Sequence, residues 1–145
     1  MKRKKELSEE LYEVLAELLN RKNNIVVLDS IRGEYGVLNC LADSESGLSA
    51  GELSQYLNVV PGRMADILKS LEQKNLIVRS RDETDRRIVN VTITEEGRTV
   101  SRRKREEIHR EYEGLFKILG EKDIKEFIRL LKIVLAYYPD KPDKN

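Results

Sequence analysis

Guanidinium and amide side chains are the groups in this sequence whose type and spacing point to a chemistry. Arg63 and Gln73 lie in one short segment, and both side chains can form paired hydrogen bonds with base edges, Arg with guanine and Gln with adenine. Arg86 and Arg87 follow in a polar connection, from which their charges could reach phosphates or a minor groove. This pattern predicts contacts with duplex DNA through the following residues: Pro61, Gly62, Arg63, Asp66, Lys69, Ser70, Gln73, Arg86 and Arg87.

A helix over residues 61–75 is predicted to carry the first group of these side chains. Its apolar residues recur at i, i+3, i+4 and i+7, which places four of them on one buried stripe: Met64, Ile67, Leu68 and Leu71. The polar residues fall opposite this stripe, and the alternative to DNA contact is an ordinary solvated helix face. Asp66 is the exception among them, because a carboxylate repels phosphates. We expect it to accept from a cytosine amino group or to pair with an arginine of the next segment, and we favour the second.

A β-hairpin is predicted to follow this helix. Two β-rich runs, Leu76–Val78 and Ile88–Ile93, flank a polar connection that carries the arginines. Apolar residues of the second run alternate onto one face: Val89, Val91 and Ile93. We expect Asp85 to turn inward as a structural partner. One of Arg86 and Arg87 would then reach the minor groove while the other holds the hairpin to the helix, and the sequence leaves open which does which.

Cap and turn residues predict a helix-turn-helix ahead of this hairpin. Ser49–Glu52 has the Ser-x-x-Glu form of a capping box, and Asn58 tolerates the left-handed backbone of a tight turn. Pro61 suits the first turn of the second helix, where no N–H donor is needed, and Asn75 suits its end. A helix, a short turn and a second helix at this spacing are typical of a DNA-binding helix-turn-helix motif. Thr94 is expected to cap a further, long helix.

Amphipathic segments flank this lobe, which we place at residues 33–97. One covers residues 5–32, with a helix break near its end, and the other covers residues 98–138, with Gly120 dividing it. Their apolar arcs are wider than one small lobe can cover, so we expect them to pack against a second copy of the chain. The predicted dimerisation residues are Leu11, Leu15, Leu18, Phe127, Leu131, Val134, Leu135 and Tyr138.

Composition argues against several other classes of protein. The sequence has 27 Lys and Arg against 26 Asp and Glu, a net charge of +1, so any basic surface must be local. The sequence contains no run of ~18 apolar residues, the length that a membrane span requires. Its single cysteine, Cys40, fits a reducing cytosol. The sequence offers no nucleophile with a base partner and no phosphate-cradling loop, so it does not point to an enzyme. His109 has no metal-ligand set around it, so no cofactor is expected.

Two basic or polar stretches outside the lobe carry weaker expectations. The run of arginines and lysine within residues 98–105 is expected to be a solvated helix surface, with a phosphate contact as the alternative. The tail at residues 139–145 is expected to be frayed. Taken together, the elements predict a mainly α chain of the α+β class. It would consist of a winged helix-turn-helix lobe with N- and C-terminal dimerisation helices.

Over roughly half of its length the sequence resembles the MarR family of winged-helix transcriptional regulators. An Asp-Arg-Arg wing end followed by a Thr-Glu-Glu-Gly helix start, downstream of a helix-turn-helix, is a fairly specific combination. The chain departs from the family pattern at Val60, where a capping Ser is common, and at Gly62-Arg63, where small hydroxyl residues often sit. The residues that carry the resemblance are Glu52-Leu53, Leu57-Asn58-Val59, Leu71–Ile77, Asp82–Arg87 and Thr92–Gly97.

The resemblance implies a homodimer that binds a pseudo-palindromic operator, usually as a repressor. Release would come from a small phenolic or other amphipathic ligand or from thiol oxidation. Tyr12, Tyr35, Tyr56 and Tyr112 could line such a ligand pocket, although aromatic residues at helical spacing are more often core. The alternatives are a winged-helix module for protein interaction and a thiol-responsive regulator that uses Cys40. Redox-sensing relatives usually carry their reactive cysteine in the first helix, where this chain has none.

Overall fold

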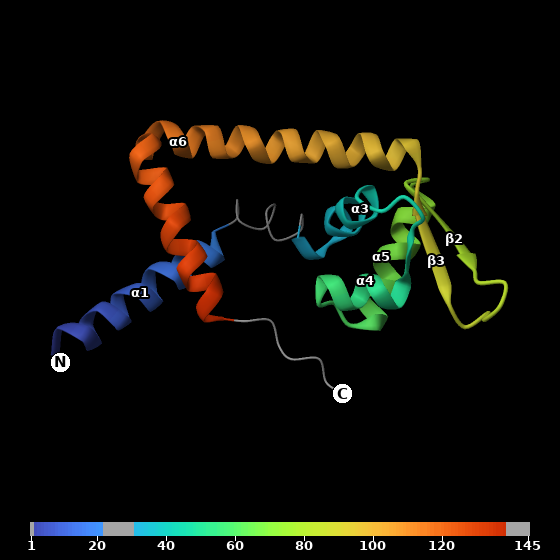
Figure 1. Ribbon diagram of the computed structural model, residues 1–145, viewed down its shortest axis with the longest axis horizontal. Coiled ribbons are helices and arrows are strands. Elements are labelled where there is room, and N and C mark those ends of the chain that lie inside the picture. Colours follow the sequence, from blue (N-terminus) through green and yellow to red (C-terminus); the bar gives the residue numbers. More distant parts are fainter. Residues whose placement is uncertain (1, 22–30, 139–145) are drawn as a thin grey trace. The chain divides into compact units, whose positions relative to one another are not determined.

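The computed structural model describes residues 2–21 and 31–138 (Figure 1). Its chain divides into two units between Arg105 and Glu106, so the first turns of the last helix belong with the lobe. The residues assigned to the tail, and most of the segment 23–35 in which a helix break is expected, lie outside the described part. In chain order the elements are α1 (Lys2–Asn20), α3 (Glu34–Ala42), β1 (Leu48–Ser49), α4 (Ala50–Leu57), α5 (Pro61–Gln73), β2 (Ile77–Arg81), β3 (Val89–Ile93) and α6 (Glu95–Tyr137).

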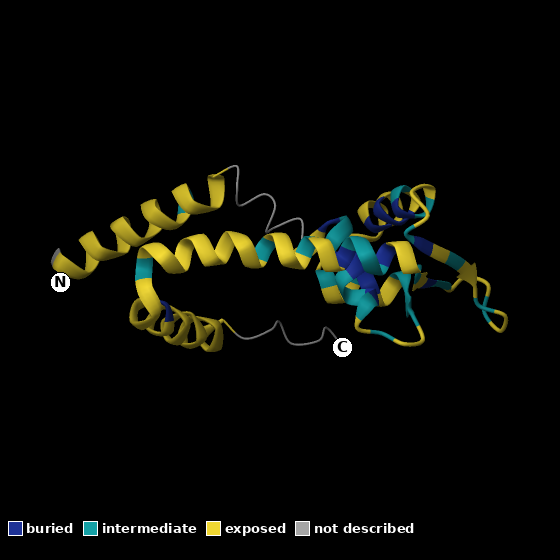
Figure 2. Ribbon diagram, turned by 90° about the horizontal axis from the view of Figure 1, so that it is seen from above, coloured by how far each residue is buried: buried dark blue, intermediate teal, exposed yellow. Residues whose placement is uncertain are grey.

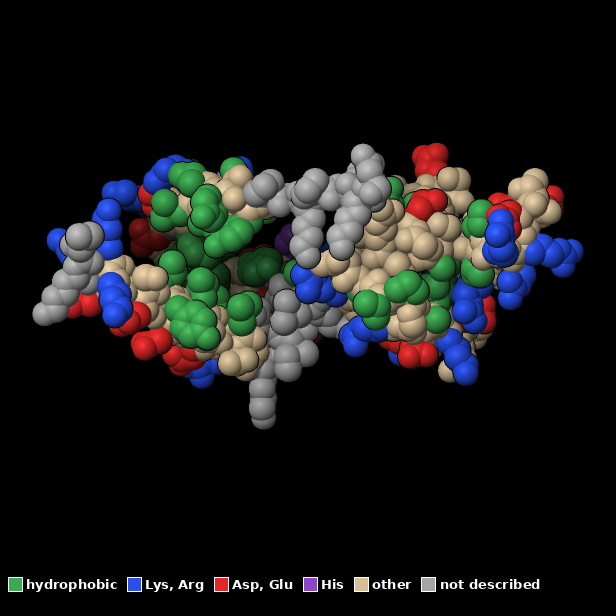
Figure 3. Space-filling view, turned by 90° about the horizontal axis from the view of Figure 1, so that it is seen from below, with side chains coloured by type: hydrophobic (Ala, Val, Ile, Leu, Met, Phe, Trp, Pro, Cys, Tyr) green, Lys and Arg blue, Asp and Glu red, His purple; other side chains and the backbone are tan. Residues whose placement is uncertain are grey.

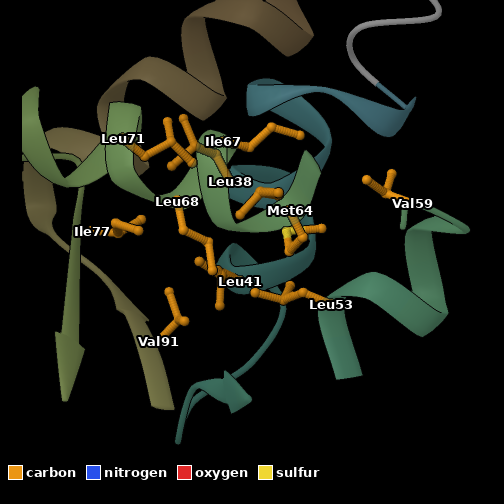
Figure 4. Packing of buried hydrophobic residues seen from close by; sticks show 11 residues of the cluster. Leu38, Leu41, Leu53, Val59, Met64, Ile67, Leu68, Leu71, Ile77 and Val91 are labelled. Atoms are coloured by element: carbon orange, nitrogen blue, oxygen red, sulfur yellow. The ribbon is translucent and has the colours of Figure 1, made fainter. Parts of the chain in front are cut away.

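A single hydrophobic core joins α3, α4, α5 and the sheet (Figure 4). The predicted stripe of α5 lies in it: Met64, Leu68 and Leu71 are almost fully buried and Ile67 nearly so. Burial of side chains of this size contributes ~1.5–3 kcal/mol each, which is why the stripe fixes the rotation of α5 about its axis. The other core residues are Val37, Leu38, Leu41, Leu53, Val59, Ile77 and Val91.

The sheet is antiparallel and has the strand order β1-β3-β2. The predicted hairpin is confirmed, since Ile77 pairs with Ile93 and Arg81 with Val89, and Val91 is the buried residue of the alternating face. The strand β1 was not predicted, because two residues are too short to show a period. Gly47 permits its pairing. It has φ +83°, and a Cβ there would come within 2.5 Å of the Val91 carbonyl oxygen.

The predicted caps and turns form with one exception. Ser49 Oγ accepts from the Glu52 N–H at 3.0 Å, but within the described residues no return bond reaches the Ser49 N–H from the Glu52 side chain. Asn58 (φ 53°) and Asn75 (φ 60°) both take the left-handed conformation, and Pro61 begins α5. The α4–α5 turn is therefore set by local residues, as expected.

The start of α6 is fixed by a close approach of two backbones. Thr94 Oγ1 accepts from the Gly97 N–H at 3.0 Å and donates to the Asn75 carbonyl at 2.8 Å. A Cβ on Gly97 would lie 2.2 Å from the Leu76 carbonyl oxygen, so only glycine fits there. Further along, Gly120 is non-helical (φ 76°, ψ 165°) and divides α6 where the sequence predicted a break.

Burial differs sharply between the parts of the chain (Figure 2). Buried residues concentrate in α3, α4, α5 and the sheet, whereas the large apolar side chains of α1 and of α6 beyond Tyr112 are mostly exposed. The helix α1 also begins earlier than predicted, at Lys2. Across residues 2–21 and 31–138, no helix combines the length and the apolar character needed to cross a bilayer.

Candidate nucleic-acid interface

The outer face of α5 carries the polar side chains that the sequence assigned to DNA. Arg63, Asp66, Lys69 and Gln73 are all exposed, as is Gly62 beside them. The helix begins without a side-chain cap, since Val60 precedes Pro61 and makes no such hydrogen bond. Apart from its chain neighbours and the backbone of its own helix, no atom lies within 4 Å of the position that a Cβ on Gly62 would occupy. The first turn of α5 is therefore open to close approach by a partner.

The wing, residues 82–88 between β2 and β3, is organised by Asp82. Its carboxylate accepts from Thr84 Oγ1 (2.6 Å), from the Thr84 N–H (2.8 Å) and from the Asp85 N–H (3.2 Å). These bonds, with the Thr84 hydroxyl first, lower the pKa of Asp82 to about 2. Arg81 Nη1 donates to the Arg86 carbonyl at 2.8 Å and ties the two sides of the tip together. With Asp82 ionised at neutral pH, these hydrogen bonds stabilise the turn at the tip.

Arg86 and Arg87 are exposed at this tip, where Figure 3 shows Lys and Arg side chains gathered over the β2–β3 end of the lobe. Arg87 is 91% exposed and donates through Nε and Nη2 to the two carboxylate oxygens of Asp85, both at 3.1 Å. Asp85 is therefore a structural partner, as predicted, but its contacts are with Arg87. Asp82 is the carboxylate that organises the turn.

The contact that holds the hairpin to α5 differs from the prediction. Arg79 donates from Nε to Glu72 Oε2 (3.1 Å) and from Nη2 to Glu72 Oε1 (3.0 Å). This bidentate pair lowers the pKa of Glu72 through the hydrogen bonds from Arg79. The expectation that Arg86 or Arg87 makes this link is wrong, and so is the expectation that Asp66 pairs with a wing arginine. Among the described residues, no side chain pairs with Asp66.

A second carboxylate links α5 to α3. Glu34, in the first turn of α3, accepts from Ser70 Oγ at 2.5 Å and from Lys74 Nζ at 2.8 Å. Burial would raise the pKa of Glu34, but the hydrogen bonds from Lys74 and Ser70 outweigh it, and the pKa is lowered. The Ser70 hydroxyl proton is thus directed at Glu34. Its place among the DNA contacts remains a prediction.

The basic run at the start of α6 binds α3. Arg98 Nη1 donates to the Ala42 carbonyl at 3.2 Å, and Arg105 Nε donates to Asn39 Oδ1 at 2.8 Å. Lys104 Nζ lies 4.6 Å from the centre of the Tyr35 ring, within cation–π range. These contacts give the run a structural role that sequence reasoning missed. Its signal was the i, i+7 spacing of Arg98 and Arg105, which places both on the helix face that meets α3.

Cys40 is partly buried beside the core. Burial, with a smaller contribution from Asp43, raises the pKa of its thiol, which lowers the thiolate fraction that oxidation requires. This weighs against the thiol-responsive alternative. No group of three or more His, Cys, Asp or Glu side chains suited to a metal ion occurs in the part of the chain that the structure describes.

The α4–α5 helix-turn-helix and the hairpin β2–β3, with its arginines at the tip, define the winged helix-turn-helix class of protein. The model of the MarR family matches residues 32–89. A solved structure of a MarR transcriptional regulator from Methanosarcina mazei is 26% identical with a TM-score of 0.68, over 86% of this chain and 94% of that one. The lobe of this chain is therefore similar to the MarR family.

Two further matches agree with this similarity. The HTH-type transcriptional regulator SarZ of Staphylococcus epidermidis is 33% identical over 66 residues, which is 46% of this chain and 44% of SarZ, so the match spans less than half of that relative. The structure of Streptococcus pneumoniae FabT in complex with DNA has a TM-score of 0.68 at 23% identity, over 90% of this chain and 96% of FabT, and shows a shared fold. A family of transcriptional regulators agrees with the expectation of a protein that is not an enzyme.

Proposed function

We propose that the chain is a sequence-specific DNA-binding transcriptional regulator that acts as a repressor and binds a pseudo-palindromic operator as a homodimer. The observation that carries this proposal is the juxtaposition, in a MarR-like lobe, of an exposed polar face on α5 with a wing whose tip holds two arginines outward. A helix can enter the major groove while such a tip reaches the backbone or the adjacent minor groove. We also propose a cytoplasmic location, with which the single cysteine of the sequence agrees.

The contacts that we propose divide between bases and phosphates. Arg63 and Gln73 suit base edges, and Lys69 suits a phosphate. Asp66, which lacks an ion-pair partner among the described residues, would accept from a cytosine amino group in the major groove. The remaining contacts would be made by Pro61, Gly62, Ser70, Arg86 and Arg87.

A second copy of the chain is the partner that we propose for the flanking helices. The apolar stripes of α1 and of α6 beyond Gly120 are exposed in the single chain, although each side chain on them would gain by burial. The proposed interface residues are Leu11, Leu15, Leu18, Phe127, Leu131, Val134, Leu135 and Tyr138. A small amphipathic effector is the further partner expected from the family. It would release DNA only if it bound more tightly to a conformation of the protein that cannot bind DNA.

Selection of duplexes from a genomic fragment library with the purified full chain tests the proposed function. We expect one enriched pseudo-palindrome whose half-sites are centred about 10–10.5 base pairs apart, or a multiple of that. The logarithm of its association constant should fall with the logarithm of salt concentration, with a slope of about −0.9 per phosphate contacted. Failure to enrich any duplex would contradict the proposal and favour a winged-helix module for protein interaction.

Exchanging the charges of Glu72 and Arg79 tests whether this pair positions the wing. Glu72→Arg and Arg79→Glu should each lower operator affinity by roughly fivefold, because a coupling of about 1 kcal/mol is reasonable for a half-exposed bidentate pair. The double exchange should restore most of the affinity, measured by fluorescence anisotropy. Glu83→Gln, which changes an exposed wing carboxylate, is the control. If Arg79 instead contacted a phosphate, the double exchange would stay as weak as Arg79→Glu.

A further inference from the structure

Val60 is an exposed apolar side chain at the start of α5. Within residues 33–105 the large hydrophobic residues classed as exposed are Tyr56, Val60, Val78 and Ile88, and Val60 is the most exposed of them at 69%. It occupies the N-cap position of α5, with extended backbone (φ −65°, ψ 147°). The side chain therefore contributes little to the core that the rest of α5 builds.

Helix capping does not explain this residue either. Ser, Thr, Asp and Asn are preferred at an N-cap because their side chains accept from the first free N–H groups, and Val is among the residues disfavoured there. Val60 makes no side-chain cap bond. The space next to it is also open, since a Cβ on Gly62 would meet nothing within 4 Å apart from its chain neighbours and the backbone of its own helix. The N-terminus of α5 therefore has no side-chain cap and carries an exposed apolar side chain instead.

We infer that Val60 is a specificity-determining residue that recognises the 5-methyl group of a thymine in the operator. This inference rests on the proposed function. The N-terminal residues of a recognition helix contact base edges, and the thymine methyl is the one apolar group on the floor of the major groove. Among the large exposed hydrophobic residues of residues 33–105, Tyr56 is the one within five positions of Val60 along the chain. Isolated side chains of this kind do not make the large contiguous patch that marks a protein interface.

Deoxyuridine scanning of the selected operator tests this assignment, because deoxyuridine lacks only the thymine methyl. Each thymine is replaced in both half-sites in turn, and binding is measured for the wild type and for Val60→Ala. At one thymine position the wild type should lose about fourfold in affinity per half-site, or roughly 15-fold for both, the change expected from exposing one methyl group. Val60→Ala should be insensitive to that replacement.

Two further variants separate recognition from folding. Val78→Ala shortens another exposed valine, 54% exposed on β2, and should keep the wild-type response to deoxyuridine. Val60→Ser should raise the melting temperature by restoring a cap while losing the preference for thymine, so stability and recognition would change in opposite directions. A wild type that binds its operator equally well with every thymine replaced, or a Val60→Ala that keeps the response, would overturn the inference. Failure to select any operator would instead count against the proposed function.

Discussion

Replacing Arg86 and Arg87 together by alanine is expected to abolish operator binding while leaving the dimer intact. Both side chains are exposed at a tip whose turn is hydrogen-bonded by Asp82 and Arg81. The variant removes the surface ion pair of Arg87 with Asp85 but no contact with the core. A dimer would lose four positive charges at its two wings. Loss of four phosphate contacts would also reduce the salt slope by about 3.6.

Electrophoretic mobility shift and anisotropy on the selected duplex measure this loss, and sedimentation equilibrium checks the dimer. Arg3→Ala combined with Arg110→Ala is the matched control, because it removes the same charge from exposed positions on α1 and α6. The control should bind within about twofold of the wild type, since distant surface charges are screened. An Arg86/Arg87 variant with unchanged affinity for the operator at physiological salt would show that the wing arginines take no part in DNA binding.

Local signals made much of the lobe predictable. The 3.6-residue period of α5 identified its buried stripe without reference to any other element, and that stripe also determined which polar residues face outward. Asn58 and Asn75 marked left-handed positions because their own side chains tolerate that conformation. Thr94 and Gly97 began α6 for equally local reasons. These features depend on few neighbours, so they could be found in the sequence.

The ion pairs of the site could not be predicted in the same way. Arg79 pairs with Glu72, and Glu34 binds Ser70 and Lys74 from 36 and 40 residues away. A chain with 27 basic and 26 acidic side chains offers many such combinations, and only the packing of α3 and β2 on α5 selects among them. Spacing did favour a charge link between α5 and the hairpin. The partners became clear only once the register of β2 was known.

An aspartate in the exposed apolar stripe of α6 is expected to have the second large effect, on dimerisation and folding. Leu131→Asp is expected to yield monomeric or unfolded protein, and Val134→Asp should do the same. Leu131 is 49% exposed in the single chain, and the proposed dimer would bury the rest of it together with its neighbours on the stripe. An aspartate there would lose this apolar contact and leave an unpaired charge in the interface, which commonly costs about 3–5 kcal/mol.

Sedimentation equilibrium with circular dichroism distinguishes the possible results of this substitution. Lys132→Asp is the control, because it introduces the same residue one position away on the charged side of α6, and it should remain a folded dimer. Since operator binding by two half-sites needs both lobes, a folded Leu131→Asp monomer should also lose operator affinity steeply while keeping weak, salt-sensitive binding to any duplex. A Leu131→Asp protein that sediments as a folded dimer would show that Leu131 does not lie in the dimer interface.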